Sequence, residues 1–490
     1  MFSRKAQALL GPFCMKVQSY IKQGIELVPV EIEVSLMPGV PNIHFLGQPD
    51  ALIKESVLRI KSALKNQGYS MPQGQQVVVN LRPAQLKKQS QGLDLAVAAA
   101  YLWETGQVPN PPGQDVKLYG ELDLQGAVIV PDDLKSLLRY SKHTSVMTGL
   151  SHESFEFETR QIGYLNELDS PTDVKPNQRV RHYTRPSRQN LKFPVELSKS
   201  MAVVAAGEHP CLFAGPAGSG KTTCIEAIHS LLDHPQDREF EQARQIHRIL
   251  GGDLEWRPCI QPHHSVSEVA MVGGGYPVRP GIISKAHGGV LVLDELLEFN
   301  SQVKESLREP IQKGYVTVAR RDQVVKLPAR FLLLATSNLC PCGDLVPDKM
   351  PNCRYSLIRC RSYLEKLSGP LLDRFHMLEM TEPYSGGEEV GVEAIFQKVQ
   401  SAITFRKQYR QQMLPNALIA DDIVEAWVKK YDLESVMPEL RMSRRRRMAL
   451  VKIARTLADL EAREAMSPQH IDQAMQWTFL NFKKLATIFN

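Results

Sequence analysis

A glycine-rich turn, Gly-Pro-Ala-Gly-Ser-Gly-Lys-Thr at residues 215–222, constrains the fold of this chain more than any other feature. It follows the apolar run 211–214 and precedes a helix-like stretch at 222–232. Glycines let backbone N–H groups approach phosphate oxygens, the lysine supplies a cation, and the threonine offers a hydroxyl to Mg²⁺. We therefore expect a loop that binds a nucleoside triphosphate. Its predicted binding residues are Gly215, Pro216, Ala217, Gly218, Ser219, Gly220, Lys221, Thr222 and Thr223.

Two acidic residues follow a second apolar run at 290–293. The run is typical of a buried parallel strand, and such strands present ligand-binding residues at their carboxyl ends. Asp294 would orient Mg²⁺ together with Thr222, and Glu295 would polarise the attacking water. The alternative is a core strand followed by acids that cap a helix, and the nearby phosphate loop makes this alternative less favoured.

Three further residues are candidates for catalysis. Asn338 ends another buried strand, predicted at 331–338, from which it could bind the γ-phosphate or the lytic water. Arg374 lies on a short amphipathic segment and Arg445 at the start of a predicted helix. Arginines in such places can stabilise charge that develops in the transition state, although each could also be a solvated surface side chain.

The composition indicates a globular protein of two or three domains, since the chain has 490 residues of which 43% are apolar. No apolar stretch approaches the roughly 18 residues that a membrane-spanning helix needs. The N-terminal residues lead into no apolar signal core, so we expect a cytoplasmic protein without a membrane partner. The net charge of +6 permits an anionic partner but does not require one.

Changes in periodicity along the chain predict its domains. Alternating residues at 25–36 and the run 77–81 predict strands, while 53–66 and 93–103 predict helices. Residues 169–190 are rich in Pro, Arg, Gln, Ser and Thr, which is typical of a linker. We expect an α+β domain at 1–168, a linker at 169–190, a nucleotide-binding core at 191–383 and a helical lid at 384–490, in which Ser467-Pro468 begins a helix.

Four of the eight cysteines fall within one short segment, a distribution more typical of metal binding than of a disulfide scaffold. Cys340, Cys342, Cys353 and Cys360 could supply four thiolates to one Zn²⁺. The alternative is a set of reduced, inert cysteines in a loop after a strand.

A charged hairpin is predicted shortly before Asn338. Two β-prone runs at 315–318 and 324–327 flank a turn that contains Arg320 and Arg321. Together with Lys326, these arginines could follow the phosphates of DNA, single-stranded or branched, without reading its sequence. The alternative is a solvated hairpin that packs against a neighbouring molecule.

Taken together, the motifs resemble those of AAA+ ATPases, and specifically the magnesium-chelatase-like family of ComM and YifB. The segments that carry the resemblance are 212–222, 262–265, 272–275, 279–281, 293–296, 307–310, 368–374 and 454–456. The resemblance implies that Asn338 is the sensor-1 residue, Arg374 the arginine finger that enters a neighbour's site, and Arg445 the sensor-2 arginine of the lid. An arginine finger implies a homo-oligomeric ring, expected to be a hexamer.

The implied fold is an α/β AAA+ P-loop parallel sheet with a helical lid, preceded by an α+β domain that resembles the Lon protease. The segments behind that second resemblance are 28–31, 47–50, 54–56 and 120–122. A Ser-Lys protease needs a hydroxyl beside a lysine. Here Gly92 occupies the nucleophile's place and Leu137 the lysine's, so we expect no protease activity. A shifted dyad of Ser90 and Lys135 is the alternative.

The implied function is an ATP hydrolase that uses Mg²⁺ and couples hydrolysis to DNA translocation or branch migration, as a ComM-like helicase in recombination or natural transformation. The first alternative is a chelatase-type or chaperone-like ATPase that remodels a protein partner without DNA. A nucleotide-dependent binding module without motor activity is the second. Residues 191–198 depart from the family's adenine-binding box, so the choice of ATP over GTP is implied by the resemblance alone.

Overall fold

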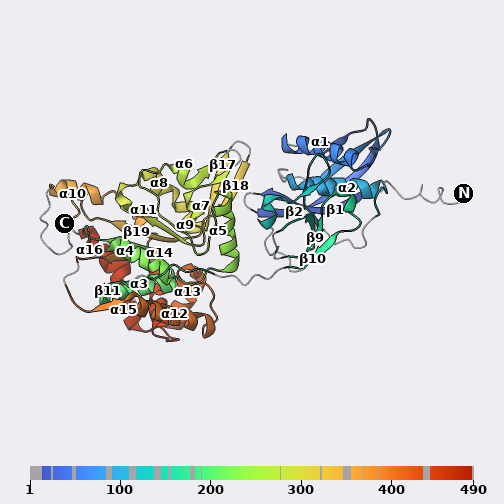
Figure 1. The fold of residues 1–490 in the computed structure, drawn as a ribbon. Helices are drawn as coiled ribbons and strands as arrows, with labels where there is room; N and C mark the ends of the chain where they lie inside the picture. The colour runs from blue at the N-terminus through green and yellow to red at the C-terminus, as the bar shows by residue number, and fades with distance from the viewer. Residues whose placement is uncertain are drawn as a thin grey trace. The chain divides into compact units, whose positions relative to one another are not determined.

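The computed structural model divides the chain into two compact units, 1–181 and 182–490, each described here by itself (Figure 1). It describes residues 14–23, 26–46, 51–83, 91–109, 117–136, 145–152, 155, 157–176, 183–188, 190–275, 278–320, 323–345, 355–367, 369–383, 386–433 and 442–487.

The first unit is an eight-stranded sheet packed with two helices, in the strand order β10-β9-β8-β5-β1-β2-β4-β3. The four predicted elements are confirmed as β2 (Glu26–Pro38), α1 (Ala51–Asn66), β4 (Gln75–Arg82) and α2 (Asp94–Glu104). The other strands of this sheet are β1 (Met15–Gln23), β3 (Ile43–Phe45), β5 (Lys117–Leu118), β8 (Val146–Gly149), β9 (Thr159–Ile162) and β10 (Thr172–Val174). Val30, Ile32 and Val34 of β2 are buried because their face of the strand covers the core.

A tyrosine fills the space beside Gly92, the position predicted to replace a protease nucleophile. A Cβ atom built on Gly92 would lie 2.4 Å from ring carbons of Tyr119. That ring is fully buried, and its hydroxyl donates to Asp133 Oδ1 at 2.8 Å. A side chain at residue 92 would therefore have to displace a fixed aromatic ring.

The second unit contains a five-stranded parallel sheet in the order β13-β16-β19-β12-β20. Its strands are β12 (Cys211–Ala214), β13 (Cys259–Ile260), β16 (Val290–Leu293), β19 (Leu332–Ser337) and β20 (Met377–Met380). Three of these are the apolar runs predicted as buried strands, and their continuous apolar character reflects cover on both faces of a parallel sheet. The helices of this core include α3 (Val195–Gly207), α4 (Lys221–Leu231), α5 (Asp237–Ile249), α8 (Ser301–Ser306), α9 (Arg308–Lys313), α10 (Leu357–Leu364) and α11 (Gly369–Leu372).

The C-terminal part of this unit is helical, with α12 (Val392–Gln408), α13 (Asp421–Lys430), α14 (Arg444–Leu460), α15 (Pro468–Met475) and α16 (Asn481–Thr487). The predicted helix start at Ser467-Pro468 is confirmed, because Ser467 and His470 form a capping box.

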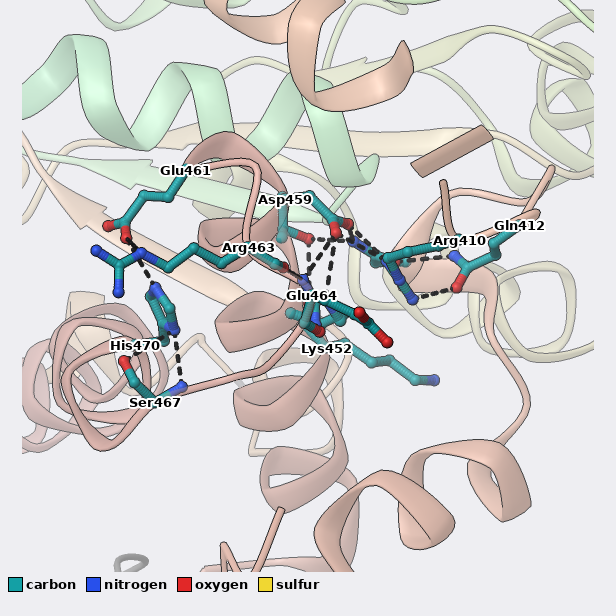
Figure 2. A network of polar contacts seen from close by, with 12 residues as sticks. Arg410, Gln412, Lys452, Asp459, Glu461, Arg463, Glu464, Ser467 and His470 are labelled. Atoms are coloured by element: carbon teal, nitrogen blue, oxygen red, sulfur yellow. Dashed lines mark hydrogen bonds and ion pairs between the residues drawn. The ribbon is translucent and has the colours of Figure 1, made fainter. Parts of the chain in front are cut away.

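A buried polar network fixes α14 within the helical part (Figure 2). Asp459 is 3% exposed and accepts hydrogen bonds from Arg410 at 2.7 and 2.9 Å. The guanidinium of Arg455, on the same helix, lies 3.0 Å from Asp459. Near the end of α14, Glu461 contacts His470 at 3.1 Å. Side chains from the segment after α12 and from α15 thus hold α14 in place.

Contacts extend into both ends of the stretch predicted as a linker. At one end, β10 pairs with β9 in the first unit. At the other, the Tyr183 hydroxyl donates to Asp237 at 2.8 Å, and the Arg185 guanidinium lies 4.9 Å from the Trp256 ring centre. Arg188 binds Glu393 of α12 at 2.7 Å, so residues 183–188 contact both the core and the helical part of the second unit.

Candidate nucleotide-binding site

The glycine-rich loop joins β12 to α4 at the carboxyl edge of the parallel sheet. Gly215 donates its N–H to the Ser337 carbonyl at 3.1 Å, and a Cβ there would lie 2.2 Å from the Thr381 carbonyl oxygen. Gly220 has φ of +81° immediately before α4, a conformation that L side chains rarely adopt. Glycine is therefore required at both ends of the loop.

Lys221 begins α4 and points back at the loop. Its side chain is buried, and Nζ donates to the carbonyls of Gly215 at 3.0 Å and Pro216 at 2.6 Å. Burial lowers the pKa of Lys221, while the nearby charges of Asp294 and Glu295 act in the opposite direction. The structure thus brings the predicted lysine and both predicted acids into one site.

A threonine that sequence reasoning missed holds the two acids. Thr336 on β19 is 1% exposed, and its Oγ1 donates to Asp294 Oδ1 at 2.5 Å. The same oxygen accepts the backbone N–H of Glu295 at 2.9 Å. Gln261, also missed, donates to Asp294 Oδ2 at 3.3 Å. The sequence did offer one sign of this role, because Thr336 is a hydroxyl residue that ends an otherwise apolar run.

Glu295 has φ of +55°, in the left-handed region that non-glycine residues seldom occupy. Such a conformation costs on the order of 1 kcal/mol or more and is found mainly where the surroundings impose it, often at functional sites. Here the hydrogen bond from its N–H to Thr336 helps to impose it. The Glu295 side chain is exposed beside the loop.

These residues fit a magnesium-bound triphosphate. The loop has no side chain at the two tight positions, the amino end of α4 presents N–H groups, and Lys221 supplies a cation. Thr222 and Thr223 lie half-buried in the first turn of α4. Hydroxyl and carboxylate oxygens, from Thr222 and Asp294, are the ligands that Mg²⁺ prefers.

The segment after β19 contacts the phosphate loop. Asn338 follows the strand directly and is half-buried. Further along, the Gly343 carbonyl accepts the N–H of Ala217 at 2.7 Å. Between these residues, the Sγ atoms of Cys340 and Cys342 lie 2.6 Å apart, and burial raises the pKa of Cys340 to about 11.

The predicted zinc site stays a prediction. Cys360 is buried on α10, whereas Cys353 lies outside the described residues. Within the described ranges, no group of three or more His, Cys, Asp or Glu side chains could hold a metal ion. The structure therefore offers no support for zinc.

The two predicted arginines come together away from the loop. Arg374 is 8% exposed, and its pKa is lowered by burial and by the charges of Arg445 and Arg308. Arg446 binds Asp373 at 3.0 Å, which packs the first turn of α14 against the turn that carries Arg374. Arg445 is exposed beside it.

The predicted hairpin is confirmed as β17 (Tyr315–Arg320) and β18 (Gln323–Pro328). Lys326 is exposed, and its Nζ lies 4.9 Å from the centre of the Tyr315 ring. Arg321 and the side chain of Arg320 lie outside the described residues.

The parallel sheet, the loop after β12 and the acids after β16 define the class of AAA+ P-loop proteins of the magnesium-chelatase type. Comparisons with known families agree. The family described as magnesium chelatase, subunit ChlI, matches residues 190–388. The family described as subunit ChlI of Mg-chelatase matches 32–145, and the family described as magnesium chelatase, subunit ChlI C-terminal, matches 391–478.

The relatives narrow the class to one family. The chain is 31% identical to the uncharacterized protein YifB of Salmonella typhimurium over 93% of this chain and 95% of that protein. It is 28% identical to competence protein ComM of Haemophilus influenzae, over 94% and 96%. It is 25% identical to the chloroplastic magnesium-chelatase subunit ChlI of Glycine max, over 26% and 37%. The chain belongs to the magnesium-chelatase-like family of YifB and ComM.

In the part of the chain that the structure describes, no helix combines the length and apolarity needed to cross a membrane.

Proposed function

We propose that the chain is a cytoplasmic, ring-forming ATPase that couples ATP hydrolysis to translocation on DNA or branch migration, in recombination or natural transformation. The observation that carries this proposal is the pair of acids fixed by Thr336 beside Lys221 and the glycine loop. Phosphoryl transfer depends mainly on positioning and on neutralising charge, and this site supplies both.

Each residue has a distinct role in the proposal. The loop N–H groups and Lys221 bind the phosphates, and Thr222 with Asp294 hold Mg²⁺, which neutralises phosphate charge when bound. Glu295 accepts a proton from the attacking water, and Asn338 orients that water from the neighbouring strand. The proposed site thus draws on β12, β16 and β19, which are adjacent in the sheet.

The sheet topology supports a ring. Strands β12 and β20 are parallel, with Cys211 opposite Met377 and Ala214 opposite Met380. The loop follows β12, whereas Arg374 precedes β20, so the two lie toward opposite edges of a sheet whose four-residue strands span roughly 13 Å. Arg374, with Arg445 beside it, is therefore better placed to serve a neighbouring subunit than its own loop. A hexamer is the expected assembly.

DNA is the proposed substrate of the motor. The name of ComM, a competence protein, supports this, as does the β17–β18 hairpin with its basic residues. Replacing Arg320 and Arg321 by alanine should weaken binding of single-stranded and forked DNA at low salt, while nucleotide affinity stays unchanged. Arg361→Ala is the control, because that arginine is exposed on α10 and pairs with Glu365. If the variant lacking Arg320 and Arg321 bound DNA as tightly as Arg361→Ala, the hairpin would not be the DNA-binding element.

The alternative is a chelatase-type ATPase that remodels a protein partner without DNA, and the ChlI match over 190–388 supports it. An assay of phosphate release with single-stranded, duplex and forked DNA separates the two functions. Hydrolysis that DNA stimulates supports the motor on DNA, and hydrolysis indifferent to DNA supports the alternative. Nucleotide binding without turnover would reject both.

For the first unit we propose an interaction module without protease activity, since the Tyr119 ring occupies the space beside Gly92. Loss of a peptidase activity in a Ser90→Ala protein would contradict this.

A further inference from the structure

A positively charged cavity lies next to Arg374. It has a volume of about 430 Å³ and is lined by residues 297–299 after β16, by residues of α8 and α9, and by the segments around α10 and α11. Lys304, Arg308 and Lys366 contribute cations, and Glu298 and Glu305 contribute acids. Leu371 also lines it and accepts the N–H of Arg374 at 3.0 Å, so the cavity and the arginine belong to one surface.

The acids of the cavity already have partners. Glu305 forms an ion pair with Arg308, and Glu298 is hydrogen-bonded to Tyr363. Neither Lys304 nor Lys366 forms an ion pair with a carboxylate of the described residues. Burial and the charge of Lys366 lower the pKa of Lys304. The surface therefore holds more positive charge than its own acids neutralise.

Arg308 adds to this charge at Arg374 itself. Its guanidinium is close enough to lower the pKa of Arg374, alongside burial and Arg445. Like charges gathered this closely are stabilised by an anion between them. The nucleotide site of the same chain carries Asp294 and Glu295 and, in the proposed function, a triphosphate. The surface of Arg374 and Arg308 is complementary in charge to such a site, as expected of surfaces that meet in a ring.

We propose that Arg308 is a second arginine that contacts the triphosphate bound by a neighbouring copy of the chain, and that Glu305 holds it beside Arg374 for this contact. The proposal rests on the proposed ring ATPase and adds a catalytic residue to it. A guanidinium suits the task because its planar donors can bind two phosphate oxygens at once. Arg308 is half-buried, so its side chain is partly ordered before the neighbour arrives.

Mixing variants tests whether Arg308 acts between subunits. Lys221→Ala removes the phosphate contact of its own site but keeps both arginines, while Arg308→Ala keeps its own site. Each alone should hydrolyse ATP at least about tenfold more slowly than the unchanged chain. Mixed assemblies should recover activity above the sum of the two, because Lys221→Ala subunits present Arg308 to intact loops.

Mixtures of Arg374→Ala with Lys221→Ala provide the comparison. If they recover activity and the Arg308→Ala mixtures do not, the role of Arg308 is overturned while the ring ATPase stands. If the unchanged chain hydrolyses no ATP, both proposals fall. Arg361→Ala should behave as the unchanged chain, because its ion pair with Glu365 is exposed.

A binding measurement provides a second readout that needs no hydrolysis. In assemblies that carry Glu295→Gln, a fluorescent ATP analogue should dissociate about tenfold faster once Arg308→Ala is added, because a charged contact to phosphate is lost. Arg308→Lys should fall between the two, and Glu305→Gln should speed release less than Arg308→Ala does, because Arg308 keeps its charge but loses the ion pair that holds it. An unchanged dissociation rate in Arg308→Ala, with an unfolding temperature equal to that of Arg361→Ala, would overturn the proposal.

Discussion

Replacing Thr336 by valine should disable hydrolysis without preventing nucleotide binding. Valine has nearly the same shape but lacks the hydroxyl that donates to Asp294 and accepts from the Glu295 N–H. A hydrogen bond to a charged group contributes about 1.5–3 kcal/mol, and a buried N–H left without an acceptor costs about 1–3 kcal/mol. Both losses affect the position of the acids and leave the phosphate loop intact.

The size of the effect on the rate follows from these energies. If about 3 kcal/mol of positioning is lost in the transition state, kcat should fall about 100-fold, at 1.4 kcal/mol per factor of ten. A loss of half that amount still gives about tenfold. Affinity for a fluorescent ATP analogue should change less than about threefold, because Lys221 and the loop N–H groups are untouched.

Thr336→Ser is the matched control, because serine keeps the hydroxyl and loses only a buried methyl group, worth about 1 kcal/mol of folding stability. Phosphate release gives kcat, and titration of the analogue gives Kd for both variants. A kcat for Thr336→Val within twofold of that for Thr336→Ser would refute the reasoning. Parallel loss of nucleotide binding would also refute it, since the loop itself would then depend on this hydroxyl.

Three further predictions concern stability and metal content. Asp459→Asn removes the buried negative charge that pairs with two arginines and should lower the free energy of unfolding of the helical part by about 3–5 kcal/mol. Glu425→Gln, at an ion pair in which the Glu425 and Arg444 side chains are 48% and 72% exposed, should cost under about 1 kcal/mol. Urea unfolding followed by tryptophan fluorescence compares the two variants, and equal midpoints would contradict the prediction. Burial lowers the pKa of His287 from 6.5 to about 3, so below pH 6.5 the unfolded chain binds a proton that the folded chain does not. The contribution of this histidine should therefore lower the free energy of unfolding by about 1.4 kcal/mol for each unit by which the pH falls below 6.5. The free energy of unfolding should depend less steeply on pH in His287→Gln. If zinc is bound, metal analysis should give one atom per chain and lose it in Cys340→Ser or Cys342→Ser; one atom shared among several chains would dismiss it.

Apolar runs predicted the fold well because buried parallel strands leave a clear signal. The runs at 211–214 and 290–293 are strands β12 and β16 with the expected bounds, and the second ends directly before Asp294. The α+β elements of the first unit were predictable for the same reason, since their alternation or helical spacing is set by burial on one face.

The local sequence pattern did not predict which segments that are distant in the chain contact each other. Thr336 holds Asp294 across two strands that are separated by dozens of residues, and nothing in either segment specifies their register. The proximity of Arg445 to Arg374 depends in the same way on how the first turn of α14 packs against the turn after α11, through Arg446 and Asp373. Such pairings follow from tertiary packing, which a single sequence does not display.

The position of β20 connects the phosphate loop to the arginine surface within one chain. Thr381, just after this strand, donates its N–H to Ala214 at 2.8 Å and contacts Ser219 of the loop through its hydroxyl, also at 2.8 Å. Arg374 lies just before the strand, whose backbone pairs along its whole length with β12. A hydrogen-bonded strand transmits displacement far better than a flexible connection would, because its length and direction are fixed. A movement of the loop that shifts Thr381 should therefore also shift the turn of Arg374, so that the nucleotide state of one subunit changes the arginines it offers to the next.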